Sequence, residues 1–190
     1  FHKTMDKESG TLEKKILDPY AKATVGRNGP GLIITPQTLE TRKSHWTPPP
    51  MKDLVILEAH VRDLLAQAPV DLSAEERLGF RGLTKWLQSE SCYVRQLGVN
   101  AVELQPILEF DARTKSEYHW GYMPVNFFSP ASSYSSCPRS GSVIREFQEL
   151  VAAFHDAGIA VILDVVYNHV GIPAHLLNLD RSLYFRTDEF

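Results

Sequence analysis

The stretch Val161-Ile162-Leu163-Asp164-Val165-Val166-Tyr167-Asn168-His169 decides the fold class of this chain. It begins as a run of branched apolar residues, which is typical of a strand buried on both faces of a parallel sheet. It then presents Asp164, Asn168 and His169 at and just beyond the end of that run. Ligands bind at the carboxyl ends of such strands, so these polar residues are candidate site residues. A buried strand followed by an ordinary polar loop is the alternative.

A repeated pattern of helix, glycine, strand and acid predicts a βαβαβ unit with parallel strands. We expect strands over 54–60, 99–104 and 159–165, the last two beginning after Gly98 and Gly158. Apolar residues at helical spacing predict helices over 82–97 and about 142–157. The strands are expected to be neighbours in chain order, with both helices on one side. No G-x-G-x-x-G follows any strand, which argues against a dinucleotide-binding fold.

The composition is that of an ordinary globular protein, with 190 residues, 43% hydrophobic and 23% charged. A formal charge of −3 gives no electrostatic reason to expect nucleic acid or an anionic membrane as partner. The best apolar run is broken by Asp164 and is too short to span a bilayer. Cys92 and Cys137 indicate neither a disulfide framework nor a cysteine zinc site. The chain begins at Phe1 and not at Met, so we expect an excerpt of a longer protein. Its localisation is not predicted.

Two segments lack the regular pattern. Residues 1–50 are irregular or lightly stranded, and Pro48-Pro49-Pro50 predicts a stiff connector at a domain boundary. Residues 105–141 form a connection far longer than the roughly 2–6 residues usual after a strand. This loop is rich in aromatic rings, which suit the C–H faces of sugars, although most are expected to pack against the scaffold. The rings belong to Phe110, Tyr118, Trp120, Tyr122, Phe127, Phe128 and Tyr134.

Four segments in order resemble the α-amylase superfamily of glycoside hydrolases, glycoside hydrolase family 13. Asp-Val-Val-Tyr-Asn-His at 164–169 resembles its first conserved segment, and Gly-Val-Asn-Ala-Val-Glu-Leu-Gln-Pro at 98–106 resembles its second barrel strand. Trp120-Gly121-Tyr122 with residues 126–130 resembles its substrate loop. Leu-Asp-Pro-Tyr-Ala-Lys-Ala at 17–23 is similar to the junction after the starch-binding module of debranching and branching members. That junction and residues 124–128 favour a pullulanase- or isoamylase-like debranching enzyme.

The resemblance implies an α/β fold made of the first three βα units of a TIM-type (β/α)8 barrel. Residues 1–50 are then the end of an N-terminal β-sandwich starch-binding module and its linker, and 51–190 the incomplete N-terminal part of the catalytic barrel. The family's nucleophilic Asp and acid/base Glu are expected beyond Phe190. No catalytic residue is therefore assigned here, and Asp164, Glu103 and Glu58 are not given those roles.

The resemblance also implies a substrate-binding role for three residues. His169 corresponds to a histidine that hydrogen-bonds the sugar before the scissile bond, Tyr122 to the aromatic that stacks beneath that sugar, and Asp164 to a carboxylate that holds the site in shape. Trp120 and Asn168 are expected to support the site. Asn168 corresponds to a calcium-binding residue of many amylases, but debranching relatives often lack that ion, so no metal or cofactor is predicted.

The expected function of the full-length protein is retaining hydrolysis of α-1,6 branch points in starch, glycogen or pullulan. Its partner would be an α-glucan polysaccharide, with neither nucleic acid nor a membrane. One alternative is a catalytically inactive α-glucan-binding or regulatory relative, because a fold does not prove chemistry. Another is a glucan-branching transferase of the same superfamily. A zinc site built from His169 and His175 would lack a third convergent ligand.

Overall fold

The computed structural model describes residues 16–40 and 46–186 as a parallel sheet with helices on one face. The strands β1 (Ile56–Ala59), β2 (Ala101–Leu104) and β3 (Ala160–Leu163) are parallel and lie in that order. The predicted order and direction are confirmed. Each strand has four residues and is shorter than its prediction.

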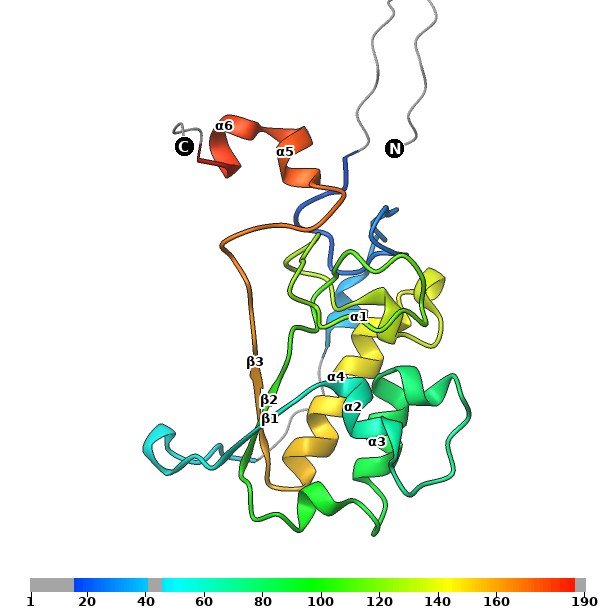
Figure 1. Ribbon diagram of the computed structural model, residues 1–190, viewed down its shortest axis with the longest axis vertical. Helices are drawn as coiled ribbons and strands as arrows, with labels where there is room; N and C mark the ends of the chain where they lie inside the picture. Colours follow the sequence, from blue (N-terminus) through cyan, green and yellow to red (C-terminus); the bar gives the residue numbers. More distant parts are fainter. Residues whose placement is uncertain (1–15, 41–45, 187–190) are drawn as a thin grey trace, which may run out of the picture.

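The register brings apolar side chains from all three strands to the helix-covered face. Leu57 pairs with Val102, which pairs with Val161. Side chains alternate along a strand, so Ala59 and Leu104 share this face. Val102 and Leu104 are fully buried and belong to the core. Figure 1 shows the sheet edge-on, with α2 (Val61–Ala66), α3 (Phe80–Leu87) and α4 (Ser142–Asp156) on one side.

The opposite face of the sheet, called the open face below, is not covered by helices among the described residues (Figure 1). By strand alternation it carries Ile56, Glu58, Glu103 and Ile162. Glu58 and Glu103 are register partners, and Ile56 is 47% exposed. The open face therefore carries paired acids toward the carboxyl ends of the strands and an exposed isoleucine at the amino end of β1.

One predicted helix is confirmed and the other is wrong in its extent. The helix α4 ends at Asp156, close to the predicted end at 157. The helix predicted over 82–97 is instead α3, which stops at Leu87, followed by the 3-10 turn η3 (Tyr93–Arg95). Ser89 Oγ donates 2.7 Å to the Trp86 carbonyl, and serine side chains that bond the backbone compete with helix continuation. Consequently Leu97 is 53% exposed.

The described part of the first fifty residues packs on the same core as the sheet. Ala23 is fully buried in the core cluster, and Leu32 packs against that cluster. Within residues 16–40 and 46–50 the only β-pairing is the isolated bridge between Thr24 and Gly31, and the only helix is α1 (Pro36–Leu39). A domain boundary at residue 50 and the tail of a β-sandwich module stay predictions.

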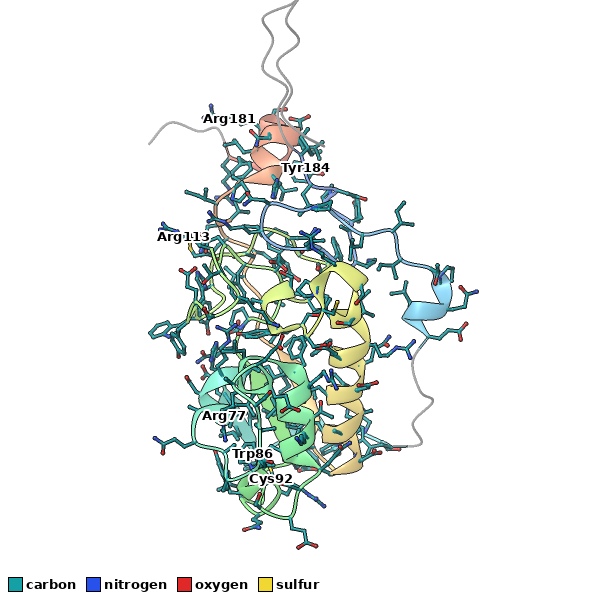
Figure 2. All side chains as sticks on the ribbon, turned by 90° about the vertical axis from the view of Figure 1, so that its right-hand side faces the viewer. Arg77, Trp86, Cys92, Arg113, Arg181 and Tyr184 are labelled. Carbon is teal, nitrogen blue, oxygen red and sulfur yellow. The ribbon has the colours of Figure 1, made fainter. Side chains whose placement is uncertain are left out.

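Beyond β3 the chain runs out from the sheet to α5 (His175–Leu179) and α6 (Arg181–Tyr184). Figure 2 shows Arg181, Tyr184 and, from the long loop, Arg113 toward one end of the molecule, and Trp86 and Cys92 at the other. The loop from 105 to 141 contains the 3-10 turns η4 (Ser132–Tyr134) and η5 (Pro138–Ser140). In the described residues no helix has the length and apolarity needed to cross a membrane.

Candidate functional site

Asp164 lies at the carboxyl end of β3 and is hydrogen-bonded to a residue of the long loop. Its backbone N–H donates to the Leu104 carbonyl at 3.1 Å, which continues the parallel ladder beyond the strand. Its carboxylate Oδ2 accepts a 2.6 Å hydrogen bond from the hydroxyl of Tyr122. That bond, then partial burial, then the charges of Asp164, Glu58 and Glu103 raise the pKa of Tyr122 to about 12. The phenol is therefore a neutral donor at all physiological pH values.

His169 joins the same pair from the other side. Its Nε2 lies 2.7 Å from the Tyr122 carbonyl oxygen, which can only accept, so Nε2 carries the proton. Nδ1 of this exposed side chain has no hydrogen-bond partner among the described residues and can accept one when the ring is neutral. The structure thus brings together the three residues predicted to bind substrate, in a connected group that we call the Tyr122 cluster: Asp164, Tyr122 and His169.

Carboxylates surround the cluster on the open face. Glu58 and Glu103 lie side by side in adjacent strands, and Gln105 Nε2 donates 3.2 Å to Glu58 Oε1. Both acids act electrostatically on the Tyr122 hydroxyl. A group of carboxylates, a phenol and an imidazole offers many acceptors and an aromatic face, which suits a ligand with many hydroxyl groups.

Among the described residues, no hydrogen bond joins either predicted supporting residue, Trp120 or Asn168, to the Tyr122 cluster. Trp120 is 63% exposed. The nearby Tyr118 hydroxyl donates a 2.9 Å hydrogen bond to Asp63 in α2, so the Tyr118 ring contacts α2. Asn168 is exposed and has no hydrogen-bond partner among the described residues. A supporting role for either side chain stays a prediction.

The predicted pair of histidines is divided between two contacts. His169 bonds the Tyr122 carbonyl, whereas His175 Nε2 lies 2.7 Å from the carbonyl oxygen of Arg27. Across residues 16–40 and 46–186 there is no group of three or more His, Cys, Asp or Glu side chains arranged to hold a metal ion. In the described part of the chain, His169 and His175 therefore do not form a common metal site.

Arg62, which sequence reasoning missed, holds the long loop in place. Its guanidinium is buried and donates to four backbone carbonyls: Nε to Leu78 at 3.1 Å, Nη2 to Lys115 at 2.6 Å and to Ser133 at 3.3 Å, and Nη1 to Glu117 at 2.5 Å. Buried charges need such partners, and carbonyls of a loop supply them where no helix or sheet does. Arg62 lies in α2, far from the loop in sequence, so no local sequence pattern indicates these contacts.

The aromatic rings of the loop divide between core and surface. Phe110 and Tyr134 are buried, and Tyr122 and Phe127 are half-buried, in line with the expectation that most rings pack against the scaffold. The exposed rings are those of Tyr118, Trp120 and Phe128. The loop therefore has an internal aromatic core and presents further aromatic surface to solvent.

Glu109 is a second residue that sequence reasoning missed, and its carboxylate is buried. Its carboxylate accepts from Thr24 Oγ1 at 3.0 Å, from the Ser132 N–H at 2.6 Å and from Ser132 Oγ at 2.9 Å. Burial outweighs these hydrogen bonds and raises the pKa of Glu109 to about 7. An acid flanked by Ile107, Leu108 and Phe110 is the sequence signal that would have found it. Glu109 fastens the N-terminal segment to the loop.

The parallel sheet with helices on one face defines an α/β protein, and ligands of such proteins bind at the carboxyl ends of the strands, where the Tyr122 cluster lies. A family described as Alpha amylase, catalytic domain, matches residues 59–180. The chain belongs to this family.

Curated relatives of the chain are debranching enzymes by name. Pullulanase of Bacillus subtilis (strain 168) is 33% identical over an alignment of 177 positions that covers 81% of this chain and 23% of that protein. Isoamylase 3, chloroplastic, of Oryza sativa subsp. japonica is 35% identical over an alignment of 205 positions that covers 91% of this chain and 25% of that protein.

Solved structures agree in fold. The crystal structure of a pullulanase from Anoxybacillus sp. LM18-11 complexed with maltotetraose has a TM-score of 0.80 and 28% identity, covering 92% of this chain and 27% of that one. The chain spans about a quarter of the length of these relatives.

Proposed function

We propose that this chain is the front part of the catalytic barrel of a glycoside hydrolase that cleaves α-1,6 branch points of starch, glycogen or pullulan. The observation that carries the proposal is the Tyr122 cluster at the carboxyl end of the sheet. An aromatic ring held beside a carboxylate and an imidazole suits a sugar ring, whose C–H face is apolar and whose rim is polar. The relatives named pullulanase and isoamylase, and the one complexed with maltotetraose, support an α-glucan as the substrate.

Each member of the cluster has its own role in this proposal. Tyr122 stacks beneath the sugar that precedes the scissile bond, and Asp164 fixes the ring by accepting a hydrogen bond from its hydroxyl. His169 is oriented through Nε2, which leaves Nδ1 to accept from a sugar hydroxyl. A side chain already held in its bound orientation loses less entropy when the ligand arrives, so this arrangement favours binding.

The chemistry itself is assigned to carboxylates beyond residue 190. A retaining glycosidase needs an acid/base and a nucleophile about 5–5.5 Å apart on either side of the scissile bond. Asp164 is engaged by Tyr122, and Glu58 by Gln105. These acids therefore shape the site. We also propose that residues 1–50 end a β-sandwich starch-binding module.

The test is an assay of the full-length protein on pullulan and on glycogen. We expect new reducing ends from both, with short linear chains as products. Transfer without new reducing ends, seen as a changed branch-length distribution, would identify a branching transferase. Retention of the protein on glycogen without either change would identify an inactive binding relative. Reading the later strands for an Asp and a Glu at their carboxyl ends is the matching check in the sequence.

A further inference from the structure

His119 stands directly before Trp120 and uses both of its ring nitrogens. Nδ1 accepts a 2.8 Å hydrogen bond from the Gly121 N–H, so Nδ1 carries no proton. The proton of the neutral ring is then on Nε2, which lies 2.8 Å from Asp111 Oδ1. The ring stacks on Phe110 with centroids 4.8 Å apart and planes 13° apart, which fixes its orientation. His119 thus links a turn of the loop to a carboxylate.

The turn that His119 bonds is the one that delivers Tyr122. Gly121 has φ +89°, a left-handed conformation that favours glycine. A Cβ built on Gly121 would lie 2.2 Å from the Pro106 carbonyl oxygen, so the turn passes tightly against the residues that follow β2. The hydrogen bond from the Gly121 N–H to His119 therefore orients this tight turn immediately before Tyr122.

Asp111 connects this turn to the segment after His169. Its Oδ2 accepts from the Ile172 N–H at 3.2 Å, while Oδ1 faces His119. Gly171 lies against it, since a Cβ there would be 3.0 Å from the Asp111 side chain. The two oxygens of one carboxylate thus join the two segments that carry Tyr122 and His169. The His119 and Asp111 side chains are 19% and 17% exposed, so solvent competes weakly for these bonds.

We propose that His119, acting with Asp111, is a positioning residue that sets the Tyr122 turn and couples it to the segment carrying His169. Its catalytic consequence rests on the function proposed above. Neither residue touches the sugar in this proposal. Their effect passes through the placement of the Tyr122 ring and of the His169 imidazole, and a misplacement of about 1 Å in an active site lowers the rate roughly 100-fold.

Isosteric variants of His119 separate its two bonds. Asn offers Oδ1 in place of Nδ1 and can still accept from the Gly121 N–H, but it has no group that reaches Asp111. Gln can place its amide N–H near the position of Nε2 and still donate to Asp111, but it then has no acceptor atom at the position of Nδ1 for the Gly121 N–H. Leu retains bulk and offers neither. His155→Leu is the matched control, because His155 lies in α4 and packs on Trp46 with centroids 4.2 Å apart.

The experiment uses the full-length protein and two readouts: kcat and KM on pullulan, and hydrogen–deuterium exchange of peptides containing Gly121 and Ile172. We expect His119→Leu to lower kcat/KM about 10- to 100-fold and to speed exchange in both peptides. His119→Asn should restore slow exchange around Gly121 and most of kcat. His119→Gln should restore only the Ile172 peptide. His155→Leu should leave both readouts at their wild-type values.

Two outcomes overturn the proposal. One is a His119→Leu variant with wild-type kcat/KM and unchanged exchange in both peptides. The other is an equal loss in the Leu, Asn and Gln variants, which would mean that the ring acts through packing alone. If the wild-type protein does not hydrolyse pullulan, the proposed function fails, but the exchange measurements still decide whether His119 and Asp111 couple the two segments.

Discussion

The Tyr122 hydroxyl donates a 2.6 Å hydrogen bond to Asp164 Oδ2 across 42 positions of sequence. The bond joins the middle of the long loop to the end of β3. The phenol pKa is raised to about 12, first because the neutral hydroxyl donates this bond and then because of partial burial. The Tyr122 hydroxyl therefore keeps its proton at physiological pH and can donate this bond, which orients the ring before any ligand binds.

Removing either partner of this bond should weaken the site. Tyr122→Phe retains the ring and deletes the donor, and we expect kcat/KM on pullulan to fall roughly 10-fold, or about 1.4 kcal/mol. Asp164→Ala, which removes the acceptor, should have a similar effect. Combining the two changes in a double-mutant cycle should give a coupling free energy of about 1 kcal/mol. Strictly additive effects would show that the two residues act independently.

His169→Ala should lower kcat/KM on pullulan or glycogen in the full-length protein by about 2–4 kcal/mol, the range for losing a positioned hydrogen-bonding group. The physical reason is that the imidazole is oriented by the Tyr122 carbonyl and presents Nδ1 outward. Steady-state kinetics of the variant beside the wild type provide the measurement. A variant with near-wild-type kcat/KM would remove His169 from the substrate site.

Two glycines make a matched test of the tight turn before Tyr122. Gly98 and Gly121 both have a left-handed φ, +78° and +89°. A Cβ on Gly98 meets nothing within 4 Å, whereas on Gly121 it meets the Pro106 carbonyl at 2.2 Å. Gly98→Ala should reduce the free energy of unfolding by about 1–2 kcal/mol, and Gly121→Ala by roughly 3 kcal/mol or more. Urea unfolding measures both. Equal losses would mean that the Gly121 turn relaxes freely.

Glu109 should make stability depend on pH. Burial raises its pKa in the folded protein to about 7, above the value near 4.5 of an unburied glutamate. Protonated Glu109 therefore contributes roughly 1–3 kcal/mol to the free energy of unfolding. This contribution is complete below about pH 4.5 and is lost as pH rises through about 7. Glu109→Gln imitates the protonated acid toward Thr24 and Ser132.

The measurement is urea unfolding of wild type and Glu109→Gln at about pH 5 and about pH 8. The variant should gain on the wild type as pH rises, because it has no proton to lose. A difference between the two proteins that is constant with pH would show that Glu109 is ionised in the folded state throughout this range.

Residues 1–190 expressed alone should associate and show no hydrolase activity. The strands β1 and β3 are edges of the described sheet, and edge strands offer unpaired backbone groups to other chains. Val55, Ile56 and Leu163 are 55%, 47% and 39% exposed. Each apolar side chain left in water forgoes part of about 1.5–3 kcal/mol, against a total stability of about 5–15 kcal/mol.

Light scattering with size-exclusion chromatography and a reducing-end assay on pullulan test this expectation. A monomer that melts cooperatively would show that the open face needs no further structure. Release of reducing ends from pullulan would show that the catalytic carboxylates are already present among these residues.

Local pattern and tertiary contact contributed differently to the helices. The helix α4 was predictable because its apolar residues recur at helical spacing up to Gly158, which has φ +77°. The end of α3 was not, because the Ser89 hydroxyl turns back to the Trp86 carbonyl where the apolar spacing continues toward Leu97. Apolar spacing reports which side chains favour burial, but a local hydrogen bond can end a helix inside such a pattern.

The sequence by itself determined the order and direction of the three strands, the side of the sheet that receives the helices, and the end at which polar side chains gather. These follow from apolar periodicity and from the handedness of βαβ connections. Only the tertiary structure decided that Tyr122 meets Asp164 and His169, that Arg62 holds the loop, and that His119 and Asp111 link its turn to Ile172. Those contacts join residues far apart in sequence through an irregular loop. Such a loop has no periodicity from which its path could be predicted, so its course is set by which buried polar groups find partners.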